Sequence, residues 1–253
     1  MSTLGVMVLS LPGMRHLAEC LKSVQWADAI VVLHAGEDEP RIPERRPSVL
    51  TVRKLVPGEE LKSLRGETRT DWVLHLLGEE RVEPELSDEL HELCRSDFAK
   101  TSPGYRVSIR TYLLGRWVEG SLWGPSPSLR LTRGLVQLPY GWWNAKEHPY
   151  EQPPGRLRGW IGDYSALDLS DAVALVNGVT SLWAEGLQHS PSHGPAALAL
   201  HPFRVFLRLL WRNRVLAKGL AGLTLSTLAA YATLLSGAKL WESQNVPRRR
   251  SPA

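Results

Sequence analysis

Short runs of consecutive apolar residues recur through the first eighty residues of the chain, and a turn or a polar segment follows each of them. Runs of this length, bounded by turn signals, are typical of strands that are buried on both faces of a sheet. The segments between them carry apolar residues at helical spacing or have a polar, helix-compatible composition. The predicted buried strands are Gly5–Ser10, Ala29–Leu33 and Trp72–Leu77. Leu50–Arg53 is predicted as a further strand, and the predicted helices are His16–Val24, Gly58–Thr70 and Pro84–Leu93.

This alternation of strands and helices predicts an α/β fold with a mostly parallel sheet that is covered by helices. In such sheets, ligands bind beyond the carboxyl ends of the strands. The loops at 10–14, 33–40 and 77–82 are therefore expected to form one functional edge.

The pattern changes twice after residue 100. Residues 105–111 alternate between polar and apolar side chains, which is typical of a half-exposed strand, and several glycines and prolines punctuate the segment that follows. From Leu167 onward the spacing of apolar residues is helical. We therefore expect a sheet domain over residues 1–165 and a helical extension over residues 166–244, with a basic disordered tail over residues 245–253.

One helix of the predicted extension combines arginines with large apolar side chains. Arg204, Arg208 and Arg212 are four residues apart, so a helix places them on one face, and Phe203 and Trp211 lie among them. A basic amphipathic helix with Phe and Trp suits the surface of an anionic membrane. The alternative is an ordinary surface helix with an arginine face.

Residues 219–238 contain no charged side chain, and a helix of this length would span a bilayer. The segment is rich in Gly, Ala, Ser and Thr, so its hydrophobicity is modest. A buried or interfacial helix is the preferred prediction over a membrane span. The short basic cluster Arg248–Arg250 would add to any attraction for anionic lipid.

Composition narrows the classes of protein that the chain can represent. With 253 residues, 43% of them hydrophobic and 22% charged, the chain can bury a core, and its net charge of +4 is compatible with anionic partners. Its two cysteines argue against a disulfide framework and against a cysteine-based zinc site, which favours a reducing cytosol. The basic residues are not interleaved with the aromatic pattern of a nucleic-acid module, so we expect no nucleic-acid partner.

Several stretches, in order along nearly the whole chain, resemble glycosyltransferase family 2 enzymes of the lipopolysaccharide-core glucosyltransferase type. This resemblance implies a GT-A-like fold, with a nucleotide-sugar domain over residues 1–165 and a membrane-associating helical extension over residues 166–244. The stretches that carry it are ECLKSVQWADAIVV at 19–32, DWVLHL at 71–76, ERVEPEL at 80–86, Gly115–Arg116, Trp123, LRLTR at 129–133, GRLRG at 155–159, DYS at 163–165 and KLWE at 239–242.

The sequence departs from that family at the polar positions that carry the chemistry. The turn after the first strand reads SLPG at 10–13 in place of a Thr-x-Asn-Glu type turn. The metal-binding Asp-x-Asp of the family would fall on Leu77–Glu79, so one carboxylate is missing. The His-Glu motif that supplies the base falls near Ala145–His148.

Sugar transfer from a nucleotide donor requires neutralisation of the diphosphate, usually by Mg²⁺ or Mn²⁺ held on carboxylates, and a general base for the acceptor hydroxyl. For an inverting transferase, the resemblance implies that Glu79 and Glu80 hold the metal and that Glu147 is the base. The donor or its nucleotide would contact His34, Asp38, Lys62 and Arg130, and the acceptor would lie near Trp123.

Two functions remain open at this stage. The first is a transferase that moves a sugar from a nucleotide-sugar donor to a lipid-linked or cell-envelope glycan, at the cytoplasmic face of the membrane. The second is a catalytically inactive pseudo-glycosyltransferase that serves as a binding or scaffold subunit beside a protein partner, which the loss of polar positions favours. The retained carboxylates at Glu79 and Glu147 favour the first.

Overall fold

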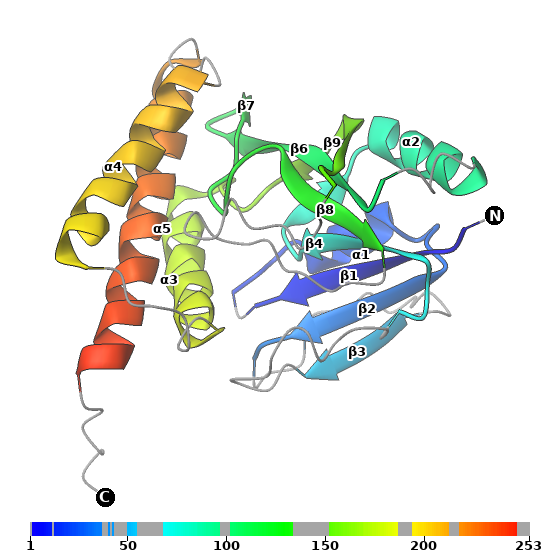
Figure 1. Ribbon diagram of the computed structural model, residues 1–253, viewed down its shortest axis with the longest axis horizontal. Coiled ribbons are helices and arrows are strands. Elements are labelled where there is room, and N and C mark those ends of the chain that lie inside the picture. Colours follow the sequence, from blue (N-terminus) through cyan, green and yellow to red (C-terminus); the bar gives the residue numbers. More distant parts are fainter. Residues whose placement is uncertain are drawn as a thin grey trace, which may run out of the picture.

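The structure is a computed structural model, and it describes residues 2–11, 13–36, 40, 42, 50–54, 68–96, 102–133, 152–186, 194–212 and 218–246 (Figure 1). Its strands are β1 (Leu4–Ser10), β2 (Ala29–His34), β3 (Leu50–Lys54), β4 (Trp72–Leu77), β5 (Glu80–Val82), β6 (Gly104–Leu113), β7 (Arg116–Glu119), β8 (Ser128–Arg133) and β9 (Gly155–Asp163). Its helices are α1 (Leu17–Ser23), α2 (Pro84–Arg95), α3 (Leu169–Gly186), α4 (Pro195–Arg212) and α5 (Leu220–Asn245). The predicted α/β class and all four of the predicted N-terminal strands are confirmed.

The strands form one sheet in the order β3-β2-β1-β4-β8-β6-β9-β5, and β7 pairs with β6. The pairs β1–β2, β2–β3, β1–β4 and β6–β9 are parallel, whereas β4–β8, β6–β8, β6–β7 and β5–β9 are antiparallel. The sheet is therefore mixed, and the prediction of a mostly parallel sheet is wrong for its second half.

The mixed pairing has a local cause in the middle of the chain. Two residues, Leu114 and Gly115, connect β6 to β7, and both have positive φ angles of 49° and 75°. Such two-residue turns match the twist of an antiparallel hairpin. Strand β8 then returns between β4 and β6 and runs antiparallel to both. The sequence signal for this hairpin is Gly115, which follows a strand of alternating polar and apolar residues.

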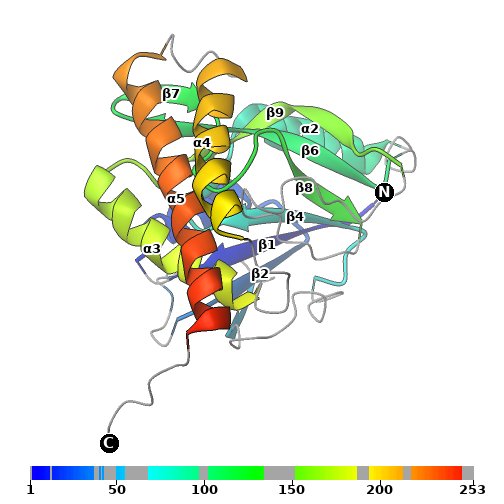
Figure 2. The same cartoon turned by 60° about the vertical axis from the view of Figure 1, so that its left-hand side comes forward.

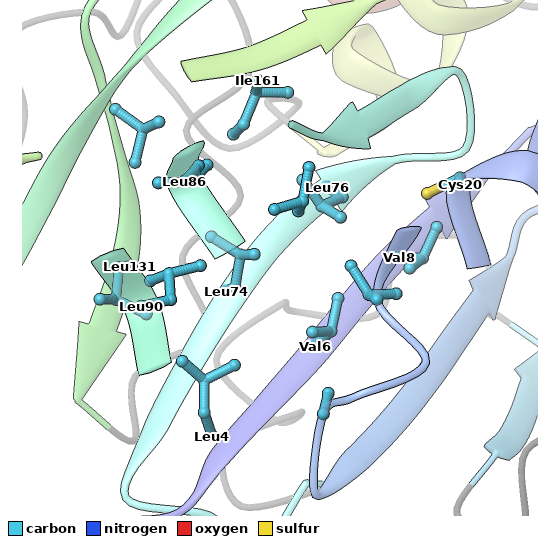
Figure 3. Close-up of a cluster of buried hydrophobic side chains, with 14 of the residues drawn as sticks. Leu4, Val6, Val8, Cys20, Leu74, Leu76, Leu86, Leu90, Leu131 and Ile161 are labelled. Carbon is cyan, nitrogen blue, oxygen red and sulfur yellow. The ribbon is translucent and has the colours of Figure 1, made fainter. Parts of the chain in front are cut away.

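Helices cover both faces of the sheet. Side chains from β1 and β4 with even residue numbers pack against α1 and α2, and Figure 3 shows Val6, Val8, Leu74, Leu76 and Leu86 in this cluster. Side chains with odd numbers, such as Met7 and Leu9, belong on the other face to a second hydrophobic cluster, which also contains residues of α3 and α5. These first strands are thus buried on both faces, as their continuous apolar runs predict.

Helix α2 approaches β9 so closely that only glycine fits beneath it. A Cβ atom at Gly159 would lie 2.4 Å from the Cα atom of Leu86. Glu89, one turn further along α2, accepts hydrogen bonds from the backbone N–H groups of Arg158 (2.8 Å) and Gly159 (2.8 Å). These bonds satisfy backbone donors of β9 where its register with β6 shifts, and they fix α2 on the sheet.

The three C-terminal helices form a layer at one end of the sheet (Figures 1 and 2). Helices α3 and α5 share a hydrophobic cluster with β1, β2 and β4, so the predicted extension shares a core with the predicted sheet domain. Helix α4 packs on α5 through Val205, Leu209 and Ala229. Of the predicted tail, residues 247–253 lie outside the described residues.

Helix α5 contains the uncharged segment that the sequence singles out. By length and composition alone it could cross a membrane, but 56% of its most apolar window is buried inside the protein. Lys239 ties it to α3, since its Nζ atom donates to the backbone oxygen of Asn177 (2.6 Å) and to the hydroxyl of Ser181 (2.8 Å). One side of α5 is therefore buried in the core of the protein.

Candidate functional site

The sheet contains a topological switch point between β1 and β4. From β1 the chain proceeds to β2 and β3 on one side, and it later returns to β4 on the other side. Ligands of open α/β sheets bind beyond the carboxyl ends of the strands at such a point. The carboxyl ends of β1, β2 and β4 lie at this common edge because the three strands are parallel.

Glu79 lies at the switch point, two residues after the end of β4. Its side chain is 3% exposed. The backbone N–H of Arg15, in the loop after β1, donates to Glu79 Oε1 at 2.5 Å. Glu79 Oε2 is buried and has no hydrogen-bond partner among the described residues, and Nε2 of His16 lies 3.9 Å from it. We call Arg15, His16 and Glu79 the switch-point site.

The environment of Glu79 favours its neutral form. Burial raises the pKa of Glu79 to about 7, although the hydrogen bond from the backbone of Arg15 and the nearby backbone N–H of His16 act in the opposite direction. Burial, with a smaller contribution from the nearby Arg81, lowers the pKa of His16. A buried carboxyl group that titrates near neutrality at a ligand-binding edge is typical of functional sites.

The raised pKa of Glu79 predicts a measurable dependence of stability on pH. Between pH 4.5 and about 7 the folded protein holds a proton on Glu79 that the unfolded chain has lost, so this residue's contribution makes stability fall as the pH rises. At about 1.4 kcal/mol per pH unit, the difference amounts to about 3 kcal/mol. Glu79→Gln stays neutral at every pH, so above pH 7 its free energy of unfolding is expected to exceed that of the wild type by up to this amount.

The measurement is urea unfolding of both proteins from pH 4.5 to 8.5. Burial also raises the pKa values of Glu80 and Asp163, but both residues are present in the wild type and in the variant. The difference between the two stability curves therefore reports Glu79. Parallel stability curves for the two proteins would contradict the raised pKa of Glu79.

Glu80 lies beside Glu79 in sequence but has a different role in the structure. Its side chain is fully buried and forms a two-pronged ion pair with Arg130 of β8, with Nη2–Oε1 at 2.7 Å and Nη1–Oε2 at 2.9 Å. Oε2 also accepts a hydrogen bond from the backbone N–H of Leu77 at 2.8 Å. Both oxygens of Glu80 and the guanidinium of Arg130 are thus used within the protein. The predicted metal and phosphate roles of these two residues stay predictions, without support from this arrangement.

A third buried carboxyl group, that of Asp163, lies at the end of β9. Its Oδ2 accepts a hydrogen bond from Thr111 Oγ1 (2.9 Å), and its Oδ1 accepts one from the backbone N–H of Ser165 (3.0 Å). Burial raises the pKa of Asp163. Ser165 also accepts a hydrogen bond from the indole N–H of Trp123 (3.2 Å), which is 1% exposed. Trp123, predicted to lie near the acceptor, is thus buried in the core.

His34 ends β2 at the same edge as the switch-point site. Its Nδ1 atom lies 3.1 Å from the hydroxyl of Ser10, the last residue of β1. Its Nε2 atom is buried without a hydrogen-bond partner within the described ranges. The structure therefore places His34 where the sequence predicts a nucleotide contact, and the contact itself stays a prediction.

The structure does not describe two of the predicted donor-site residues or the predicted base. Asp38, Lys62 and Glu147 lie outside the described residues. Within the described ranges, no group of three or more His, Cys, Asp or Glu side chains is arranged to hold a metal ion. The switch-point site would thus supply a single carboxylate to a metal.

The predicted membrane-contacting residues lie on α4, which forms the outer part of the helical layer (Figure 1). Arg204 and Arg208 are exposed, Phe203 is 57% exposed and Trp211 is 78% exposed. The side chain of Arg212 lies outside the described residues. Helix α5 adds an exposed apolar stripe at helical spacing, which consists of Leu220, Leu223, Tyr231, Leu234 and Trp241.

The sequence analysis missed Arg15, His16 and Asp163 as parts of this edge. Arg15 forms an ion pair with Asp171 in the first turn of α3 (2.8 Å), which connects the loop after β1 to the helical layer. The signal that could have identified Arg15 and His16 is their position as polar residues between the turn after the first strand and the first helix. No protein-family model matches the chain.

Proposed function

We propose that this protein is a sugar transferase of the glycosyltransferase family 2 type, which uses a nucleotide-sugar donor bound at the switch-point site. The observation that carries the proposal is the buried Glu79 carboxyl group at the switch point, with one oxygen that has no hydrogen-bond partner among the described residues. The order of the sequence stretches that resemble the family supports it as well.

Glu79 fits a metal-dependent donor site better than Glu80 does. Mg²⁺ is commonly bound by one or two carboxylates together with substrate phosphates and water. Glu79 Oε2 is the candidate ligand atom, whereas both oxygens of Glu80 already accept hydrogen bonds inside the protein. A bound Mg²⁺ or Mn²⁺ would neutralise the diphosphate leaving group. Glu147 is the proposed base for the acceptor hydroxyl, in an inverting displacement without a covalent intermediate.

The first test is calorimetric titration with UDP and UDP-sugars at pH 6.5, with and without Mn²⁺. We expect micromolar binding that depends on the metal. Because Glu79 is mostly protonated at this pH, metal binding to its carboxylate should release about three-quarters of a proton. Repeating the titration in buffers of different ionisation enthalpy measures this release.

Glu79→Gln should weaken metal-dependent UDP binding and abolish the proton release. The control is Glu83→Gln, which changes a half-buried carboxyl group four residues further along the chain, next to Tyr164. Metal-dependent UDP binding without proton release in the wild type would show that Glu79 does not bind the metal of the donor site.

A second function is favoured by the buried pair of Glu80 and Arg130. Two polar residues that the resemblance assigns to the donor site are used to hold β4, β5 and β8 together. This use suits a pseudo-glycosyltransferase that acts as a binding or scaffold subunit. The two functions separate in the same titration, since a scaffold subunit should bind no nucleotide in the presence or absence of Mn²⁺.

We further propose that α4 and the exposed stripe of α5 attach the protein to the cytoplasmic face of the membrane. Exposed Phe and Trp beside arginines are typical of helices that lie in the interface of an anionic bilayer. This attachment would bring the switch-point site to a lipid-linked or cell-envelope glycan acceptor.

A further inference from the structure

A cluster of aromatic rings lies on the outward face of β6, β7 and β9. It consists of Tyr112, Trp117, Trp160 and Tyr164, which are all half-buried. The ring centre of Trp117 lies 5.1 Å from that of Tyr112, 4.9 Å from that of Trp160 and 5.3 Å from that of Tyr164. We call these four residues the aromatic platform. Since side chains alternate along β9 and Gly159 faces α2, Trp160 points to the opposite side of the sheet from α2.

The register of the strands builds the platform. Tyr112 of β6 lies directly opposite Trp117 of β7. The indole of Trp117 extends over Gly162 of β9, where a Cβ atom would lie 3.1 Å from the Trp117 ring and 3.1 Å from the Tyr164 ring. The glycine therefore leaves the space that the two rings occupy.

Arginines flank the rings on the same face. The guanidinium of Arg81 lies 3.9 Å from the ring centre of Tyr164, and that of Arg110 lies 4.5 Å from the ring centre of Trp160. Further along the same strands, Arg106 lies opposite Arg156, whose Nη2 atom donates to the hydroxyl of Ser108 (3.3 Å).

Arginines on this face include Arg81, Arg106, Arg110 and Arg156. Its acidic neighbours include Glu119, opposite Arg110, and Glu83, which accepts a hydrogen bond from the Tyr164 hydroxyl, and Arg156 also lines a groove with the acidic residues of α2. Arg110 and Arg156 are exposed. Guanidinium groups beside aromatic rings can pair with phosphate or carboxylate groups while the rings pack against an apolar sugar face.

The platform is directly connected to the switch-point site. The backbone N–H of Tyr164 donates to the backbone oxygen of Glu79 at 3.0 Å, and Arg81 follows Glu79 by two residues. A ligand on the platform would thus lie next to a donor that is bound at the switch point.

We propose that the aromatic platform is the acceptor site and that it takes an anionic glycan, with phosphate or carboxylate groups paired to Arg110 and Arg156. The role as acceptor site rests on the proposed transferase function. The binding of an anionic glycan does not, since it requires no nucleotide and no turnover.

The experiment uses the full chain and three probes: a sulfated heparin tetrasaccharide, neutral maltotetraose and a single-stranded oligothymidine. Calorimetry measures affinity, and the indole ¹H–¹⁵N signals of Trp117 and Trp160 report the site. We expect the sulfated tetrasaccharide to bind best and to shift both signals. Arg110→Ala should weaken it by about tenfold or more, because charge-assisted hydrogen bonds are the stronger ones. Arg95→Ala, which removes an exposed arginine from α2, should leave the affinity unchanged.

Equal binding of maltotetraose and the sulfated sugar would overturn the anionic class of ligand. Preferred binding of oligothymidine, or no shift of either indole signal, would overturn the site. UDP binding is measured in the same samples. Loss of sugar binding with retained UDP binding contradicts the platform alone, whereas sugar binding without any UDP binding contradicts the transferase function alone.

Discussion

Replacing Arg130 by methionine is expected to cost about 3–5 kcal/mol of unfolding free energy, because it leaves the fully buried Glu80 without its ionic partner. The lost guanidinium also donates to the backbone oxygen of His75 (3.2 Å) and, through Nε, to the hydroxyl of Ser128 (3.0 Å). Those acceptors would stay buried with one fewer donor. Urea unfolding followed by circular dichroism measures the loss.

A double variant tests whether charge is the cause. In Glu80→Leu/Arg130→Met both charges are gone, and the buried site is filled by apolar side chains of similar volume, so much of the lost stability should return. Arg133→Met is the matched control, since it removes an exposed arginine from the same strand. The guanidinium of Arg133 lies 5.1 Å from the ring centre of Trp72. Its expected cost is about 1 kcal/mol or less. Equal losses for Arg130→Met and Arg133→Met would show that the buried pair contributes little.

Reversing two charges on α4 is expected to abolish binding to anionic vesicles. Each arginine near such a surface contributes about 1 kcal/mol, so Arg204→Glu/Arg208→Glu changes the attraction by about 4 kcal/mol, which is roughly a thousandfold in affinity. Both side chains are exposed, so the fold should be retained. Sedimentation with vesicles that contain phosphatidylglycerol measures the bound fraction.

Two comparisons make this vesicle experiment specific. Arg95→Glu/Arg133→Glu carries the same change of net charge on exposed arginines of α2 and β8, and it should still sediment with the vesicles. Trp211→Ala, which removes the most exposed of the large apolar side chains, should weaken binding without changing its dependence on salt. If both charge-reversal pairs release the protein from the vesicles equally, net charge in general, and not the α4 surface, would explain the binding.

The buried strands of this fold could be predicted because each is a continuous apolar run. Val6, Val32 and Leu74 are fully buried, and such residues leave little ambiguity between strand and loop. The second half of the sheet could not be predicted in the same way. The position of β8 between β4 and β6 depends on pairing between segments that lie far apart in sequence, and no local pattern contains it.

The candidate site was only partly predictable for a similar reason. Glu79 and His34 could be found because they follow buried strands that are parallel. Glu79 and Glu80 look equivalent as neighbours in sequence, yet one faces the loop after β1 and the other faces Arg130. That difference arises from the alternating directions of adjacent side chains and from the arrival of β8, which only the tertiary structure shows.

The common core of the sheet and the C-terminal helices sets a geometric condition on any reaction at a membrane. Because α3 and α5 share a hydrophobic cluster with the strands that carry the switch point, and Arg15 is paired with Asp171 of α3, the surface of α4 has a defined position relative to the switch point. A protein attached through α4 would therefore reach only those sugars that stand at one height above the lipid headgroups. For the proposed transferase, the length of the glycan, rather than the identity of its lipid, would then decide which acceptors are used.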